Sequence, residues 1–102
     1  MRELPIACSL DAADGARRME QWRRLGEHAQ LDAHRDGHTL AITYRPLALA
    51  ELQRLVEAER SCCSFLAWSL SPSPDRVVLT IQADDAGDPE LSRLAGLFGA
   101  SG

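Results

Sequence analysis

The stretch from Leu47 to Leu70, LALAELQRLVEAERSCCSFLAWSL, constrains the fold more than any other part of the chain. Its apolar residues first recur at spacings of three and four, as on one face of a helix, and then alternate, as in a strand. The residues of the helical stripe are Leu52, Leu55, Val56, Cys62, Cys63 and Leu66. The pattern predicts a helix from about Leu47 to Cys63 that runs directly into a strand.

Glu59 falls on the same face of this predicted helix, one turn before the adjacent cysteines Cys62 and Cys63. Side chains three or four residues apart on a helix are neighbours, so the helix would carry a carboxylate towards the thiols on its core-facing side. Two adjacent thiols beside a carboxylate are the only chemically unusual feature of the sequence.

The length and charge of the chain limit what it can be. Its 102 residues suffice for one domain with a real core, so we expect a single domain over residues 1–102. No apolar run approaches the roughly 20 residues that span a bilayer, and the first residues do not form a signal peptide. A net charge of -4 argues against general binding to nucleic acid or to anionic membranes.

The residue usage indicates a source and a compartment. All 11 basic residues are Arg, which together with the abundant Ala and Leu suggests a GC-rich bacterial genome. Without a secretion signal we expect a cytoplasmic protein, in whose reducing surroundings the three cysteines stay free thiols.

The rest of the chain shows the same two periodic patterns. We expect strands at residues 3–8, 31–35, 38–45, 66–70 and 77–81, and helices at 11–29, 47–63 and from Asp88 onwards. The element order is therefore β-α-β-β-α-β-β-α. Strands with one apolar face need one covering layer, so we expect a two-layer α+β fold in which helices pack on one face of a mainly antiparallel sheet.

The dipeptide Asp36-Gly37 is the strongest turn signal in the chain. A two-residue turn at this dipeptide would pair Arg35 with His38, and it would place His34 and His38 on opposite faces, where they are badly placed to share a metal ion. The residues expected on the core face of this hairpin are Leu31, Ala33, Leu40, Ile42 and Tyr44.

The first predicted helix is rich in arginine. Its expected core-facing residues are Ala12, Ala16, Met19, Trp22, Leu25 and Ala29. Arg17, Arg18 and Arg24 would cover the outside, and in an acidic chain we interpret them as a solvated face rather than a nucleic-acid contact.

Cys8 is a third candidate thiol ligand. It alternates with Leu4 and Ile6 in the first predicted strand, so it should point inward, where it could meet the end of the long helix. Neighbouring helical residues diverge by about 100°, so Cys62 and Cys63 can hold one ion only if the helix ends there or if Cys8 replaces one of them.

A thiol-rich site without histidine favours particular ions. Soft ions such as Cu(I), Hg(II) and trivalent arsenic prefer thiolate ligands. A structural zinc site is less well supported, because the sequence has no CxxC repeat and no well-placed histidine.

Several short motifs of the chain resemble those of a known group of proteins. They are Cys8-Ser9-Leu10, Trp22 and Leu25 in the arginine-rich helix, Glu59, Cys62-Cys63, Phe65-Leu66, Trp68 and Leu70. In these motifs the chain resembles small, uncharacterised bacterial proteins with a cysteine pair, encoded near mercury- or arsenic-type resistance regulators. The resemblance implies handling of a soft metal or metalloid, with Cys8, Cys62 and Cys63 as the candidate ligands. It does not show an enzyme activity.

We therefore expect a protein that binds a soft ion with these three cysteines, with Glu59 beside them as an outer-shell group or proton acceptor. Two alternatives remain. One is a thiol redox protein, although a helix C-terminus and Glu59 both disfavour a thiolate unless Arg60 or an arginine of the first helix offsets them. The other is a structural or protein-interaction domain whose thiols only pack. Because a chain of this size offers little cover for a five-stranded sheet, we also expect a homodimer.

Overall fold

The structure is a computed structural model that describes residues 12–62, 66–85 and 87–100, with only the backbone described at residues 12–15 and 61–62. Its elements are α1 (Ala12–Ala29), β1 (Gln30–Asp36), β2 (Thr39–Tyr44), the 3-10 turn η1 (Pro46–Ala48), α2 (Leu49–Cys62), β3 (Leu66–Pro72), β4 (Val77–Ala83) and α3 (Asp88–Phe98). The predicted α+β class and the order of these elements are confirmed. The strand predicted at residues 3–8 lies outside the described residues.

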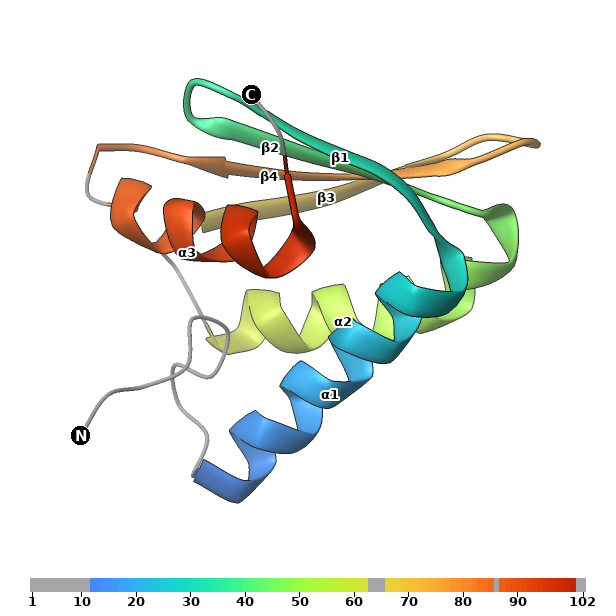
Figure 1. The fold of residues 1–102 in the computed structure, drawn as a ribbon, viewed down its shortest axis with the longest axis horizontal. Coiled ribbons are helices and arrows are strands. Elements are labelled where there is room, and N and C mark those ends of the chain that lie inside the picture. The colour runs from blue at the N-terminus through green and yellow to red at the C-terminus, as the bar shows by residue number, and fades with distance from the viewer. Residues whose placement is uncertain (1–11, 63–65, 86, 101–102) are drawn as a thin grey trace.

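The described strands form one sheet with the order β1-β2-β4-β3, and each neighbouring pair is antiparallel. Figure 1 shows α1, α2 and α3 on one side of this sheet, and no helix of the described residues on the other. The predicted two-layer arrangement is therefore correct. None of the helices described here is long and apolar enough to cross a bilayer.

The apolar stripe of α2 packs into the core as its spacing predicts. Leu52, Leu55 and Val56 are all buried. The helical region starts with the 3-10 turn η1, and Pro46 occupies its first position, where its lack of an N–H does no harm. The α-helix itself therefore begins at Leu49, two residues later than predicted.

The core between the helices and the sheet includes an aromatic cluster centred on Trp22 of α1. Its ring meets that of Phe98 on α3 edge-to-face, with centroids 5.6 Å apart, and that of Trp68 on β3 in a tilted arrangement at 5.9 Å. One side chain thereby joins α1 to both α3 and the sheet. Edge-to-face aromatic pairs stabilise a core beyond their buried area.

In the predicted β1–β2 hairpin the turn is misplaced by one residue, so the predicted pairing is shifted by two residues. Arg35 pairs with Leu40 and Asp36 with Thr39, so the two turn residues are Gly37 and His38. Gly37 has φ +61°, and among the described residues only glycines have positive φ. A two-residue turn with glycine first fits the type II′ preference, which explains why the turn uses Gly-His rather than Asp-Gly.

The prediction that Leu31 faces the core is also wrong. The register shifts between Gln30 and Asp32, which leaves Leu31 as the extra residue of a β-bulge, and Leu31 is 52% exposed. The other predicted core residues of the hairpin, Ala33, Leu40, Ile42 and Tyr44, are buried.

The exposed position of Leu31 in the bulge leads to a prediction about stability. Leu31→Ser should change the free energy of unfolding by less than about 0.5 kcal/mol, because an exposed side chain loses little on truncation. Ile42→Ala, in contrast, should lower it by roughly 2–5 kcal/mol, since it leaves a cavity in the core. Urea unfolding followed by circular dichroism compares the two variants. Equal losses of unfolding free energy in the two variants would contradict the presence of the bulge.

Candidate functional site

Glu59 of α2 is buried in the helix layer, where its side chain is 0% exposed. Its Oε2 accepts a hydrogen bond from Nε1 of Trp22 at 3.1 Å and lies 2.8 Å from Nε of Arg18. It is the one polar or charged residue that is fully buried in the described part of the chain. We call these three residues the Glu59 cluster.

Helices α1 and α2 build this cluster together. Arg18 and Trp22 are four residues apart on α1, so their side chains lie on one face and reach the same carboxylate. The prediction that Arg18 belongs to a solvated outer face is therefore wrong, because its side chain is only 13% exposed.

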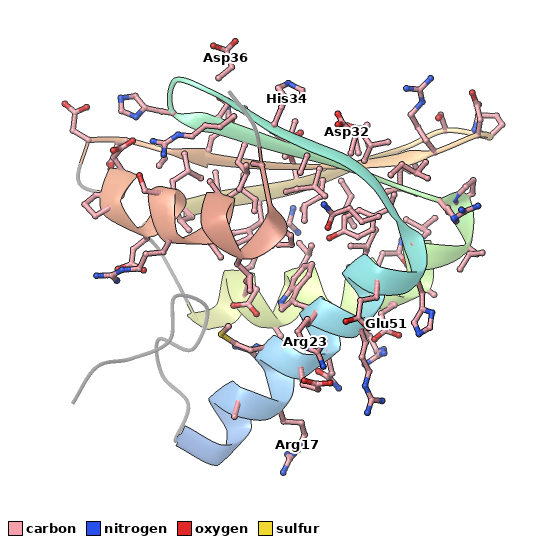
Figure 2. The ribbon with its side chains drawn as sticks, viewed as in Figure 1. Arg17, Arg23, Asp32, His34, Asp36 and Glu51 are labelled. Carbon is pink, nitrogen blue, oxygen red and sulfur yellow. The ribbon has the colours of Figure 1, made fainter. Side chains whose placement is uncertain are left out.

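The other arginines of α1 behave differently from Arg18. Arg23 and Arg24 are exposed and form ion pairs with Glu20, and Arg23 pairs with Glu27 as well. Figure 2 shows Arg17 pointing away from the body of the protein. These residues form the solvated face that the acidic composition predicts.

Burial raises the pKa of the Glu59 carboxyl to about 7, although the Trp22 hydrogen bond and the charge of Arg18 act in the opposite direction. Its second oxygen, Oε1, is buried and has no hydrogen-bond partner among the described residues. The same is true of Nε1 of Trp68. A carboxyl with a pKa near neutrality and one unoccupied oxygen can accept or release a proton under ordinary conditions.

Cys62, the first residue of the cysteine pair, is the last residue of α2. Helix α2 extends to Cys62 and β3 begins at Leu66. The backbone of α2 therefore places Cys62 one turn after Glu59. Cys8, Cys63 and the side chain of Cys62 lie outside what the structure describes, so the convergence of the three thiols stays a prediction.

The structure gives the two hairpin histidines different partners. His34 lies 3.7 Å from Asp32, and Figure 2 shows both on the side of the sheet away from the helices. His38 contacts Asp88 at 3.0 Å and Asp85 at 3.3 Å. Within the described residues, no group of three or more His, Cys, Asp or Glu side chains is arranged to hold a metal ion.

Arg18 and Trp22 are the site residues that the sequence analysis missed. A signal for them was present, because a carboxylate on an apolar stripe needs buried donors. Trp22 was already expected to face the core, and Arg18 precedes it by one helical turn. What the sequence could not supply was the packing of α1 against α2.

No family model, curated protein or solved structure matches the chain. The resemblance to cysteine-pair proteins encoded near resistance regulators thus stays a prediction from the sequence. The function of the site has to be inferred from its own residues.

The raised pKa of Glu59 makes stability depend on pH. The folded-state value of about 7 exceeds the ordinary 4.5, so the folded protein holds a proton that the unfolded chain releases between these pH values. This bound proton stabilises the folded protein. Its contribution to the free energy of unfolding is complete below about pH 4.5 and is lost as the pH rises through about 7. It amounts to roughly 3 kcal/mol.

Glu59→Gln should remove this contribution. The difference in unfolding free energy between parent and variant, measured by urea unfolding, should therefore change in favour of the variant as the pH rises from 4.5 to 8. Glu27→Gln, at an exposed position of α1, is the control and should show no such trend. A parallel pH profile for parent and Glu59→Gln would contradict the assignment.

Proposed function

We propose that the protein binds a soft, thiophilic ion through Cys62 and Cys63, with Cys8 as a third thiol, and that Glu59 is an outer-shell group or proton acceptor. The observation that carries the proposal is the buried Glu59 carboxylate one helical turn before Cys62. Buried carboxylates are rare in proteins unless they have partners or a chemical task.

The chain is long enough for Cys8 to reach the end of α2. Arg18 contacts Glu59, and Ala12, at the start of α1, lies six residues before Arg18, or about 9 Å along the helix. Four further residues can span up to about 14 Å. Figure 1 shows the start of α1 and the end of α2 on the same side of the molecule, which supports a site shared by the three cysteines.

The chemistry of thiols sets how such a site would work. Thiolate, rather than thiol, binds the ion, so uptake of Hg(II) or Cu(I) displaces protons and weakens as the pH falls. Glu59 can take up one of these protons because its pKa is about 7 and its Oε1 has no partner among the described residues. Metal binding is favoured over redox catalysis, because the C-terminal end of α2 disfavours a permanently reactive thiolate.

Ion uptake by the purified, reduced protein tests the proposal. Mass spectrometry under non-denaturing conditions should show one Hg(II) or trivalent arsenic per chain. The double variant Cys62→Ser/Cys63→Ser should lose high-affinity uptake, and Cys8→Ser should weaken it if three thiols converge. Glu59→Ala should change the pH dependence of uptake more than its stoichiometry. A double variant that binds as tightly as the parent would show the proposal to be wrong.

We also propose that the chain forms a homodimer through the sheet face that no helix of the described residues covers. At the centre of this face, Ala41 pairs with Thr80 and Thr43 with Val78, and all four are small or β-branched and half-buried. Such side chains suit close packing of one sheet on another.

The homodimer can be tested by sedimentation. The parent at micromolar concentration should have twice the chain mass of 11.2 kDa, and Val78→Arg should give the monomer, because it places a charge at the centre of the interface. Arg76→Ala, in the exposed β3–β4 turn, is the control. A parent that sediments as a monomer would rule the interface out.

A further inference from the structure

A pocket of about 480 Å³ lies between α1, the start of β1 and the end of α3. Its volume falls in the range of roughly 300–1,000 Å³ that small-molecule sites have. The residues that line it include Arg23, Gly26, Glu27, Gln30, Leu31 and Leu97. We call it the α1–β1–α3 pocket. All of these residues lie in the described part of the chain and none of them is a cysteine, so the pocket is separate from the proposed ion site.

Gly26, in the second half of α1, makes room for the side chain of Gln30. A β-carbon at Gly26 would stand 3.2 Å from Oε1 of Gln30, closer than an ordinary van der Waals contact. Nε2 of the same amide donates to the backbone oxygen of Phe98 at 2.9 Å, which ties the start of β1 to the end of α3. Glycine is unfavourable inside a helix. Its presence at this position therefore keeps the Gln30 amide, with Oε1 as an acceptor, at the pocket.

The polar side chains of the pocket leave acceptors rather than donors for a ligand. Arg23 already donates from Nε and Nη2 to Glu20 and from Nη1 to Glu27. The Gln30 amide donates to the end of α3, which leaves its Oε1 and the second carboxylate oxygen of Glu27 to accept from a ligand. One guanidinium shared by two carboxylates also leaves this wall of the pocket with one excess negative charge.

Two helix ends add to this negative potential. Helix α1 ends at Ala29 and α3 ends at Phe98, and residues of both last turns line the pocket. The C-terminal end of a helix carries a partial negative charge. The pocket therefore favours a cation that can donate several hydrogen bonds. An ammonium group fits this requirement, because it has three N–H donors and no acceptor.

The remaining lining is apolar. Leu31, the bulge residue, is 52% exposed, and Leu97 of α3 is half-buried. A second pocket, of about 290 Å³, adjoins the first, because Arg23 and Leu97 line both, and its lining also includes Ala16 and Met19. An apolar chain attached to the cation can therefore lie along Leu97 and bury its surface against both helices.

We propose that the α1–β1–α3 pocket binds a small primary amine with an apolar chain, whose ammonium group donates to Glu27 and to Oε1 of Gln30. The chain lies along Leu97 towards Met19. Binding is non-covalent, so no bond breaks and no electron is transferred. Arg23 opposes the ammonium charge and occupies one oxygen of Glu27, so it limits the affinity for amines. An apolar surface alone would instead bind any chain of the same length, whatever its head group.

Titration calorimetry with n-octylamine, n-octanol and octanoate compares three head groups on one chain at about pH 7.5, where an alkylamine is protonated. Octylamine should bind about ten-fold more tightly than the other two, because hydrogen bonds to charged groups are stronger than neutral ones. The amide signals of Gly26 and Gln30 should shift in NMR spectra of the titrated protein. Octanol that binds as tightly as octylamine, or shifts confined to other parts of the chain, would overturn the proposal.

Variants of opposite charge give the sharpest test. Glu27→Gln removes a negative charge, so octylamine should bind about three-fold more weakly, whereas Arg23→Gln should strengthen binding by a similar factor. A purely structural role would not shift the two affinities in opposite directions. Gly26→Ala should weaken binding, because the added β-carbon displaces the Gln30 amide. Arg93→Gln, in an exposed ion pair elsewhere on α3, is the control and should bind octylamine as the parent does.

Leu31→Ser separates ligand binding from stability. Its exposed position predicts an almost unchanged free energy of unfolding, yet octylamine should bind about three-fold more weakly, because the lining loses apolar surface. Circular dichroism shows that each variant is folded. The double variant Cys62→Ser/Cys63→Ser should bind octylamine like the parent, so failure of amine binding and failure of ion uptake are distinguishable.

Three further outcomes would overturn the proposal. The first is a parent that does not bind octylamine, and the second is an Arg23→Gln variant that binds it more weakly than the parent. The third is tighter binding of Nα-acetyl-lysine amide, which carries the same ammonium group on a side chain, than of octylamine. That result would assign the pocket to a lysine of a partner protein rather than to a free amine.

Discussion

The fold depends on how a buried carboxylate is accommodated between two helices. Taking the charge of Glu59 out of water is unfavourable, and the Arg18 ion pair and the Trp22 hydrogen bond, which join α1 to α2, offset only part of this cost. Removing one partner of such a pair typically costs about 3–5 kcal/mol, but replacing the whole group by apolar residues is often neutral or stabilising. Stability alone is therefore a weak explanation of the Glu59 cluster, and the proposed ion site at the end of α2 would give the cluster a task.

The end of α2 is held from two directions by consecutive residues. Glu59 attaches it to α1, and Arg60 donates from Nε and Nη2 to the backbone oxygen of Trp68 on β3, at 3.1 and 2.9 Å. Trp22 completes the arrangement, because it bonds Glu59 and packs on Trp68. Cys62 follows on the same helix. An ion site that includes Cys62 would have the backbone of this residue fixed by α2 before an ion arrives, which lowers the entropy lost on binding.

The sequence predicted the helices and strands well because their apolar residues recur at clear helical or strand spacings. The prediction failed where three-dimensional packing determines the structure. The apolar stripe of α2 and the alternation of β2 and β4 need only local information. The position of the hairpin turn depends on which turn residue must have positive φ, and Gly37 comes first rather than second. The bulge at Leu31 interrupts a regular alternation of apolar and polar residues, and the alternation itself gives no sign of the bulge. The burial of Glu59 followed from its place on the stripe, whereas Arg18 needed the contact between helices.

The balance of charges in the proposed site also bears on how its thiols would behave without an ion. The C-terminal end of a helix and a carboxylate both disfavour thiolates, so neutral thiols would persist and resist oxidation, which proceeds through the thiolate. A soft ion then supplies the missing positive charge itself. Such a site would stay protonated when empty and form thiolates only in the presence of an ion, which suits capture of an ion better than redox catalysis.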